Sequence, residues 1–272
     1  LEGIDLHLVE GSILDPGALA HATTVDGAAV EAIVHLAAIP SVPRSIADPV
    51  ASHEANATGT LRVLEAARTL GDPIVVVASS SSVYGANPAL PKHEDLAPAP
   101  VSPYAASKLA TESYALAWQA AFGLPVLAFR FFNVYGPLQP ADHAYAAVIP
   151  RFVDAALAGR PVEIHGDGHQ SRDFTYVDTV TGVLVQAVTD RVTHPGPVNL
   201  AFGVPCDLLG LLDRLEAEVG TPIAREHVDP RPGDVRHSNA DSTRLTELFP
   251  DLEPVGLDRG LPATVEWFRS EA

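Results

Sequence analysis

The sequence predicts an α/β fold, in which a doubly wound parallel sheet is joined to a smaller C-terminal lobe. Short apolar runs alternate with longer helical patterns along the chain, as they do in sheets covered by helices on both faces. Several runs are apolar at nearly every position, which is typical of buried parallel strands. After about residue 135, proline and glycine become frequent and the segments between them are short. This change predicts a second lobe, interleaved with the last strands of the sheet.

The individual elements follow from the same patterns. Apolar runs predict strands at 6–9, 32–36, 74–79, 126–131 and 198–200. Helical periodicity predicts helices at 50–70, 103–122, 146–158, 179–189 and 208–219.

The composition limits the protein's setting and partners. The chain has 272 residues and a formal net charge of −17, which argues against nucleic acid and anionic membrane surfaces as partners. It contains no apolar run long enough to span a bilayer and no secretion leader pattern. Its single cysteine, Cys206, cannot form an internal disulfide. A cytoplasmic setting is therefore expected.

The sharpest motif is YAASK at 104–108, which opens a predicted helix directly after Ser102 and Pro103. Tyr104 and Lys108 are four residues apart, so they lie on one helical face. A neighbouring ammonium favours tyrosinate, and a tyrosine whose pKa falls from about 10 toward neutrality could act as a base. Taken alone, this spacing is common by chance and more often belongs to an ordinary surface helix.

Two further motifs place polar groups at the ends of predicted strands. Strand 74–79 runs into SSSSVYG at 79–85, and strand 126–131 runs into RFFNVYGP at 130–137. Open α/β sheets bind ligands at the carboxyl ends of their parallel strands. A serine hydroxyl there could hydrogen-bond a substrate oxygen and share a proton with Tyr104. The alternative for the serines is a flexible loop.

In this order and spacing, the three motifs resemble those of the extended short-chain dehydrogenase/reductases in the NAD-dependent epimerase/dehydratase family that act on nucleotide sugars. Four more segments resemble family motifs: HLAA at 35–38, NATGT at 56–60, SRDFTYVD at 171–178 and RPGD at 231–234. The resemblance implies a Rossmann-type fold with NAD as cofactor. It implies an NAD-binding domain at 1–135, incomplete at its N-terminus and completed by about 174–200, and an interleaved substrate-binding lobe at 136–272.

The resemblance also implies a role for each matching residue. Tyr104 is the acid/base, Lys108 holds the nicotinamide ribose and tunes Tyr104, and Ser80 binds the reacting sugar oxygen. The residues implied to contact NAD are Ser12, Ile13, Leu36, Ala37, Ala38, Asn56, Tyr104, Lys108 and Phe131. Those implied to contact the UDP-sugar are Ser80, Ser81, Ser82, Asn133, Val148, Arg172, Arg231, Asp234 and Ser238. No metal is implied.

The family's opening strand, glycine-rich turn and helix, which hold the NAD pyrophosphate, are not found in the sequence. VEGSILD at 9–15 resembles the adenine-binding strand end, with Ser12 where an aspartate often stands. We therefore expect an N-terminally truncated Rossmann-type chain that lacks about 30 residues or more and binds NAD weakly or not at all. An incomplete reading frame and a natural truncation are both open.

Among the family's reactions, the resemblance favours epimerisation. Dehydratases and decarboxylases of this type usually carry a carboxylate at the positions of Ser80, Ser81 and Ser82, and this chain has none there. In the implied reaction, Tyr104 takes the proton of the sugar O4 and the sugar C4 gives hydride to NAD. The transient 4-keto sugar turns over, and hydride returns to its opposite face.

The expected substrates are UDP-GlcNAc and UDP-GalNAc. Segments 144–150 and 233–238 resemble the acetyl-sugar epimerases more than the galactose enzymes, which tend to carry a bulky tyrosine at the position of Ser238. UDP-glucose or UDP-glucuronate 4-epimerisation, and a non-catalytic UDP-sugar-binding protein, stay open. The family also implies a homodimer in which helices 50–70 and 103–122 pack against their copies.

Overall fold

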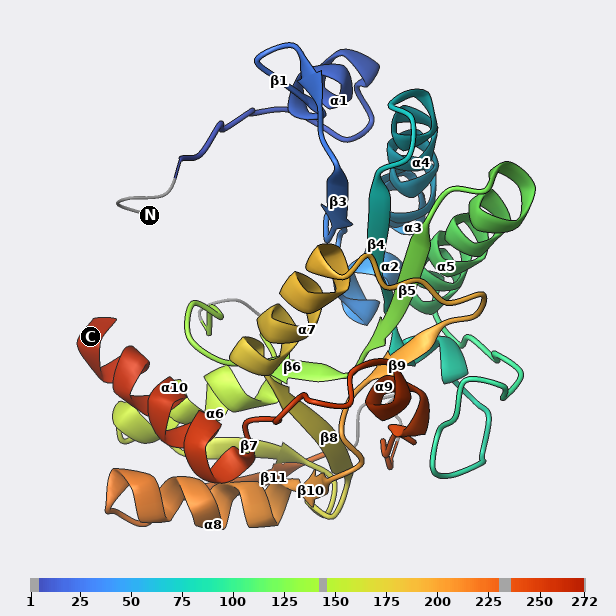
Figure 1. The fold of residues 1–272 in the computed structure, drawn as a ribbon. Coiled ribbons are helices and arrows are strands. Elements are labelled where there is room, and N and C mark those ends of the chain that lie inside the picture. The colour runs from blue at the N-terminus through green and yellow to red at the C-terminus, as the bar shows by residue number, and fades with distance from the viewer. Residues whose placement is uncertain (1–4, 142–145, 230–235, 272) are drawn as a thin grey trace. The chain divides into compact units, whose positions relative to one another are not determined.

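The computed structural model describes residues 5–141, 146–229 and 236–271. Figure 1 shows the course of the chain, which forms two compact units, each built from three stretches. Unit 1 takes Leu1–Val83, Pro100–Arg130 and Leu184–Val198. Unit 2 takes Tyr84–Ala99, Phe131–Val183 and Asn199–Ala272.

The four-stranded sheet confirms the predicted α/β class. Its strands are β3 (Ala32–His35), β4 (Ile74–Ser80), β5 (Val126–Phe131) and β9 (Val198–Leu200), in the order β3-β4-β5-β9. β3 and β4 belong to unit 1, and β9 begins in unit 1 at Val198 and ends in unit 2. β3 and β4 run parallel, with His35 opposite Val77. Every residue of β4 is buried, as expected for a central strand covered on both faces. All four strands lie where the apolar runs predicted them.

The predicted strand at 6–9 is wrong. Residues 5–12 have no regular structure, and Leu6 and Leu8 are 57% and 77% exposed. A strand needs a neighbour that pairs with its backbone, and none of the described strands pairs with this segment. The apolar pattern indicates strand propensity, but it does not indicate whether a neighbouring strand is present to pair with.

The stretch that follows contains elements that the sequence analysis did not predict. Helix α1 (Pro16–Ala22) begins at Asp15, whose side chain accepts a hydrogen bond from the Gly17 N–H at 2.8 Å. A small hairpin of β1 (Thr24–Val25) and β2 (Ala28–Ala29) comes next. Asp26 and Gly27 have φ angles of 50° and 80°, the positive values that two-residue hairpin turns need.

The next helix of unit 1 after α1 is α2 (Val42–Ala47). The predicted helix 50–70 is one helical stretch made of α3 (Pro49–His53), a π-helical turn η1 (Glu54–Thr58) and α4 (Gly59–Thr69). Helix α5 (Pro103–Phe122) has the predicted bounds. Apolar side chains of α4, α5, β4 and β5 form a core that includes Leu64, Val75, Val77, Ala115 and Val126.

Unit 2 contains two small sheets. A three-stranded sheet has the order β10-β8-β6, made of β10 (Pro205–Asp207), β8 (Ser171–Tyr176) and β6 (Asn133–Tyr135). A parallel pair consists of β7 (Val162–His165) and β11 (Arg225–Val228). The helices are α6 (Val148–Leu157), α8 (Leu208–Val219), α9 (Thr243–Leu248) and α10 (Leu257–Glu271), while α7 (Val177–Thr189) lies partly in each unit. A 3-10 turn, η2 (Ser81–Tyr84), follows β4.

The core of unit 2 lies between its helices and its sheets. It includes Ile149 and Phe152 of α6, Leu212 of α8, Tyr176 of β8 and Val265 of α10. The predicted helices 146–158, 179–189 and 208–219 correspond to α6, α7 and α8. Among the described residues, no helix is both long and apolar enough to cross a membrane.

Candidate active site

The three predicted catalytic residues lie together in unit 1. Ser80 is the last residue of β4, and Tyr104 and Lys108 stand one turn apart at the start of α5. The side chains of Tyr104 and Ser80 are hydrogen-bonded to each other. The Ser80 Oγ also accepts hydrogen bonds from the Ser82 hydroxyl at 2.9 Å and the Ser82 N–H at 3.2 Å. The strand end and the helix start thus bring the two separate motifs into one cluster.

The structure differs from the expectation that Lys108 lowers the pKa of Tyr104. Burial raises the pKa of Tyr104, and the hydrogen bond with Ser80 lowers it in part. Desolvation disfavours the charged phenolate more strongly than one hydroxyl donor can stabilise it. In the protein alone, Tyr104 is therefore a neutral acid and not a preformed base.

Burial also acts on two basic groups of unit 1, Lys108 and His35. It lowers the pKa of Lys108 to about 8. It lowers the pKa of His35 to about 4, with a smaller contribution from the positive charge of Lys108. His35 ends β3 and is 6% exposed. Lys108 is therefore held close to the carboxyl end of β3, beside an imidazole that stays neutral at physiological pH.

Asn56 organises a buried polar network behind these residues. Its side-chain oxygen accepts the Ile39 N–H at 2.7 Å, and its amide donates to the Ser107 hydroxyl at 2.9 Å. Ser107 in turn donates to the Tyr104 carbonyl at 2.8 Å. Asn56 lies in the π-helical turn η1, and such turns often occur at functional sites. The residue predicted to contact the cofactor therefore ties the chain beyond β3 to the start of α5.

A second buried network was missed by the sequence analysis. Arg130 donates to both carboxylate oxygens of Glu112, at 2.9 and 2.7 Å. The Ser79 hydroxyl donates to the same carboxylate at 2.9 Å. The only available signals were charged residues inside otherwise apolar elements. From the sequence alone, Glu112 and Arg130 could equally be charged residues exposed to solvent.

The remaining predicted cofactor residues surround the carboxyl ends of the unit 1 strands. Leu36 and Ala37 follow β3 and are exposed, and Ala38 is half-buried. Phe131 ends β5 and is half-buried. Ser12 is exposed, and its hydroxyl accepts the Leu14 N–H at 3.2 Å.

Ile13 packs against Gly59 of α4, where an added Cβ would lie 2.4 Å from the Ile13 Cδ1. The segment at 12–13 is therefore held close to the helix that carries the Asn56 network. A larger residue at position 59 would require the Ile13 side chain to shift.

The predicted substrate residues of unit 2 gather on β6 and β8. Asn133 donates to the Asp173 carbonyl at 3.0 Å, and Arg172 donates to the carbonyls of Ser171 and Arg236 at 2.9 and 3.3 Å. Ser238 donates its N–H to the Ser171 carbonyl at 3.0 Å, which places the backbone of Ser238 beside the strand that carries Arg172.

Val148 begins α6 and is half-buried. Ser81 and Ser82 lie in the 3-10 turn η2 of unit 1 and are half-buried. Arg231 and Asp234 lie outside the described residues.

Asp173 is a buried carboxylate that the sequence analysis did not single out. It is 1% exposed, and its Oδ2 accepts the N–H groups of Gly203 and Ala240 at 2.9 and 3.1 Å. Burial raises the pKa of Asp173, and several backbone N–H donors oppose that effect. Asp173 therefore joins β8 to the loop after β9 and to the segment that carries Ser238.

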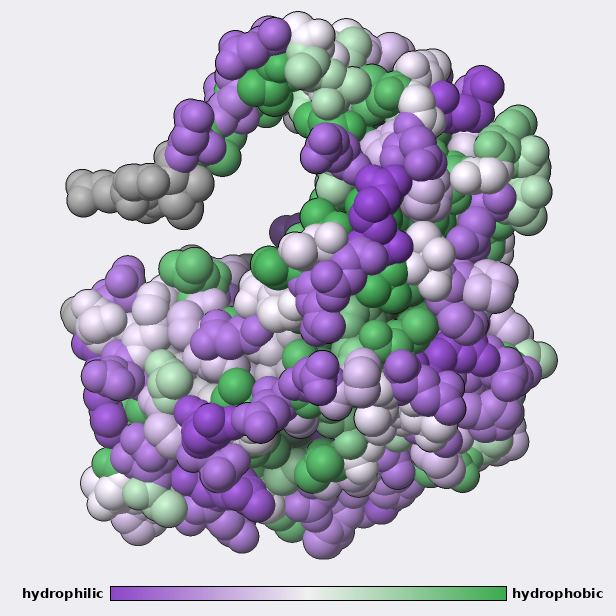
Figure 2. Space-filling view, viewed as in Figure 1, coloured by the Kyte–Doolittle hydropathy of each residue, from purple (hydrophilic) through white to green (hydrophobic). Residues whose placement is uncertain are grey.

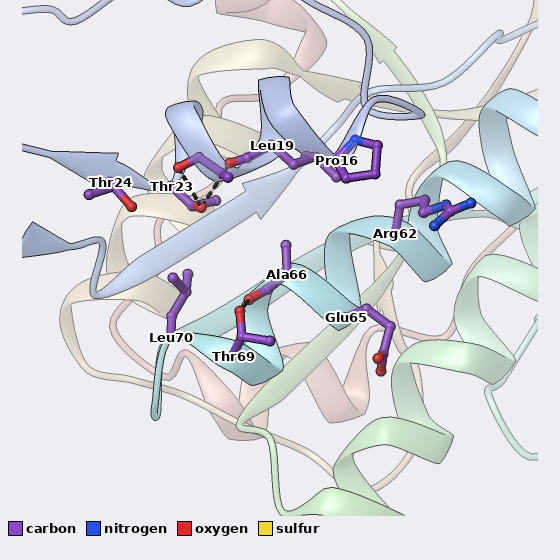
Figure 3. Close-up of a pocket in the computed structure, with 10 residues that line it drawn as sticks. Pro16, Leu19, Thr23, Thr24, Arg62, Glu65, Ala66, Thr69 and Leu70 are labelled. Carbon is purple, nitrogen blue, oxygen red and sulfur yellow. Dashed lines mark hydrogen bonds between the residues drawn. The ribbon is translucent and has the colours of Figure 1, made fainter.

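A surface pocket of about 320 Å³ lies elsewhere in unit 1, between α1 and α4. Figure 3 shows Leu19 of α1 and Thr23, which follows that helix, on one side and Arg62, Glu65 and Thr69 of α4 on the other. None of the predicted site residues lines it. The Thr23 hydroxyl donates to the Leu19 carbonyl at 2.8 Å. Because its lining contains none of the predicted site residues, the pocket is not assigned to the candidate active site.

Comparison with known proteins gives one consistent result. Residues 2–201 match the model of the NAD dependent epimerase/dehydratase family. A UDP-glucose 4-epimerase of Mycolicibacterium smegmatis is 39% identical over 249 residues, which cover 89% of this chain and 77% of the relative. A UDP-glucuronate 4-epimerase of Thermodesulfobacterium geofontis is 33% identical over 241 residues, which cover 88% of this chain and 72% of the relative.

Solved structures of similar fold carry related ligands. A UDP-N-acetylglucosamine 4-epimerase from Methanobrevibacter ruminantium, in complex with UDP-N-acetylmuramic acid, superposes with a TM-score of 0.87 at 34% identity, covering 93% of this chain and 80% of that one. A UDP-glucuronic acid 4-epimerase from Bacillus cereus, in complex with UDP-glucuronic acid and NAD, superposes with a TM-score of 0.85 at 30% identity, covering 96% of this chain and 81% of that one.

Proposed function

Because the chain belongs to the NAD-dependent epimerase/dehydratase family and is an NAD-dependent enzyme of that family, we propose that it interconverts UDP-sugars that differ in configuration at C4. The observation that carries the proposal is the cluster of Ser80, Tyr104 and Lys108 at the carboxyl end of a buried parallel strand. Relatives of three substrate specificities share the 4-epimerase reaction, which supports the reaction class more strongly than any one sugar.

The residues of the cluster fit this chemistry. In the proposed reaction, Tyr104 exchanges a proton with a sugar hydroxyl, and Ser80, whose side chain is hydrogen-bonded to Tyr104, hydrogen-bonds the same oxygen. NAD, when bound, supplies reversible acceptance of hydride from the sugar C4. Tyr104 holds its proton in the protein alone, so a positive charge near its hydroxyl is needed before it can act as the base.

The residues present also fit NAD itself. The Lys108 ammonium is buried, and a cation of this kind suits the hydroxyls of a ribose. Leu36 and Ala37 expose their side chains directly after β3, where an open α/β sheet receives a nucleotide. We propose that Lys108, Tyr104 and the segment 36–38 hold the nicotinamide half, with Ser12 and Ile13 toward the adenine half.

The test of the proposed function is the substitution Tyr104→Phe, which removes the hydroxyl and keeps the ring. We expect UDP-sugar 4-epimerisation to fall by about 10²–10⁴ in kcat/KM, the range that a general acid/base contributes. UDP-sugar affinity should stay within about threefold, because the UDP contacts are proposed to lie in unit 2. Tyr114→Phe removes a hydroxyl from the exposed side of the same helix and should leave both quantities unchanged. Turnover by Tyr104→Phe within tenfold of the parent would remove Tyr104 from the role of acid/base.

We further propose UDP-GlcNAc and UDP-GalNAc as the preferred pair. Ser238 is small and half-buried, and its backbone N–H is hydrogen-bonded to the strand that carries Arg172. In the proposed complex this segment contacts the sugar, and the small Ser238 side chain leaves room for an acetamido group at C2. UDP-glucose and UDP-glucuronate 4-epimerisation are the alternatives, supported by the relatives that carry those names.

The substitution Ser238→Tyr tests the sugar preference. Steric exclusion rejects a larger substrate strongly, whereas a spare cavity rejects a smaller one only weakly. We expect kcat/KM for the acetylated pair to fall at least tenfold and kcat/KM for UDP-glucose and UDP-galactose to stay within threefold. Ser242→Tyr, at another half-buried serine of the same unit, is the control for bulk alone. Equal losses on both pairs would show that Ser238 does not face C2.

We propose a homodimer in a cytoplasmic setting. Helix α5 is a long helix whose only charged residues, Lys108 and Glu112, are both buried. Its exposed positions are therefore uncharged, and they include Tyr114, Ala117 and Phe122. Figure 2 shows apolar surface at the C-terminal end of α5, at the upper right. An uncharged helix face of this kind suits a second copy of the same helix, and a two-fold dimer is the commonest assembly.

A further inference from the structure

The carboxylate of Glu112 is buried in unit 1 and fully engaged. The side chains of Glu112 and Arg130 are 5% and 3% exposed, and they form a two-pronged ion pair. Ser79 supplies a third donor to the same carboxylate at 2.9 Å. Buried ion pairs are rarely a source of net stability, because desolvation of both charges offsets their attraction. The buried Glu112–Arg130 pair is therefore expected to have a role other than stabilising the fold.

The position of the pair links three elements of the candidate active site. Glu112 follows Lys108 by one helical turn and Tyr104 by two on α5. Arg130 lies near the end of β5, and Ser79 immediately precedes Ser80 on β4. The Ser79 hydroxyl also lies 3.3 Å from the Lys108 carbonyl. Both partners of Glu112, Arg130 and Ser79, therefore lie near the carboxyl end of a strand.

We propose that Glu112, clasped by Arg130 and Ser79, is a positioning residue that fixes where α5 lies along β4, and so sets Tyr104 and Lys108 against Ser80. The inference rests on the proposed function, because it assigns the pair to the catalytic cluster described above. It concerns geometry alone, since Glu112 contacts Arg130 and Ser79 and acts through the helix.

The packing of α5 shows why a directional contact is needed. Its buried positions are mostly small or polar, with Ala105, Ser107, Thr111 and Ala115 among them. Small side chains interdigitate weakly, so a helix packed through them resists sliding less than one packed through large apolar side chains. Two parallel hydrogen bonds from a planar guanidinium fix both position and orientation. A shift of about 1 Å at a catalytic group is enough to lose much of its effect.

The test replaces the pair by apolar side chains of similar length, Glu112→Met with Arg130→Met. Such replacements often leave stability unchanged or improve it, so the proposal predicts a folded protein with a displaced site. We expect a Tm within a few degrees of the parent, a kcat lower by tenfold or more, and a KM for UDP-sugar within about threefold. Asp154→Met with Arg160→Met removes an exposed ion pair of unit 2 and should change none of the three.

A second readout does not depend on activity. Lys92 and Lys108 are the only lysines of the chain, so the rate at which an amine reagent modifies each of them can be followed against pH by mass spectrometry of peptides. In the parent, burial lowers the pKa of Lys108 to about 8. In the double variant the midpoint for Lys108 should rise toward its ordinary value, because a displaced helix admits water, while Lys92 serves as the internal reference.

The outcomes separate the two proposals. Unchanged kcat and an unchanged Lys108 midpoint in the double variant would overturn the positioning role. A parent protein with no epimerase activity would refute the proposed function, and the Lys108 midpoint would still report on the positioning role. If the double variant does not fold, Ser79→Ala, which leaves the ion pair in place, should shift the Lys108 midpoint in the same direction. An unshifted midpoint in that variant would equally contradict the proposal.

Discussion

His35 is buried at the end of β3, and its Nε2 lies 3.0 Å from the Thr60 hydroxyl. Burial, together with the positive charge of Lys108, lowers its pKa from 6.5 to about 4. The unfolded chain therefore binds a proton at a higher pH than the folded chain does. Between pH 6.5 and 4 the free energy of unfolding should fall as the pH falls, by up to about 3 kcal/mol from this residue.

The measurement is urea unfolding at pH 7 and at pH 4.5. His35→Gln removes the titrating group and keeps a polar side chain, so the loss of stability between the two pH values should be smaller in this variant than in the parent. His53→Gln, at an exposed histidine of the same unit, is the control for the same substitution outside the buried site. Identical pH dependence in the parent and in His35→Gln would contradict the prediction.

Gly260 lies where α10 meets the aromatic residues of β6 and β8. An added Cβ there would be 2.3 Å from the Tyr135 hydroxyl oxygen and 2.7 Å from the Tyr176 Cδ2. Gly260→Ala should therefore destabilise unit 2 by about 1–3 kcal/mol through overpacking. Gly182→Ala, at a helical glycine with nothing within 4 Å of the added Cβ, should be neutral or stabilising by up to about 1 kcal/mol. Thermal unfolding of both variants makes the comparison, and an equal effect at the two sites would refute it.

At the scale of residues, sequence patterns identified the proposed catalytic groups better than the groups that hold them in place. Tyr104, Lys108 and Ser80 stand in motifs with a fixed spacing, and they do meet in space. The contacts of Glu112, Arg130 and Asp173 could not be identified from the sequence, because they join positions far apart in the chain. A charged residue in an apolar element is the only local sign of such a contact, and it does not indicate which residue the charge contacts.

At the scale of elements, local chemistry determined which bounds could be predicted. Helix α5 was predicted exactly because Ser102 caps its first turn, Pro103 opens it and Gly123, at φ 72°, closes it. The segment 6–9 failed for the opposite reason, since strand formation depends on a partner that no local pattern describes. The π-helical turn around Asn56 was also beyond prediction, because it follows from buried hydrogen bonds to Thr60 and Thr111.

The short strands of unit 2 were missed on similar grounds. β6 and β10 are three residues long, too short for periodicity to stand out from a loop. β8 begins with three polar residues in succession, and it was recognised only as a motif with proposed contacts. Its role as the central strand of a sheet follows from pairing with β6 and β10, which the sequence does not express.

At the scale of the whole molecule, the net charge of −17 bears on self-association. Two copies of so acidic a chain repel each other at long range, so a dimer requires an interface from which charge is excluded. The exposed face of α5 meets that requirement, because both charged residues of the helix are buried. Salt screens the remaining repulsion, so the proposed dimer should become tighter as ionic strength rises from about 0.01 M to 0.15 M.

The substitution Ala117→Glu tests the dimer at its proposed centre. Ala117 is exposed on α5, and a two-fold axis would bring the two introduced carboxylates close together in a desolvated interface. We expect light scattering to give the mass of a dimer for the parent and of a monomer for the variant, with unit 1 still folded by circular dichroism. Ala217→Glu, at an exposed alanine of α8 in unit 2, adds the same charge outside the proposed interface and should remain dimeric. A parent that is monomeric at 0.15 M salt, or two variants that behave alike, would show that the uncharged face of α5 does not bind a second copy.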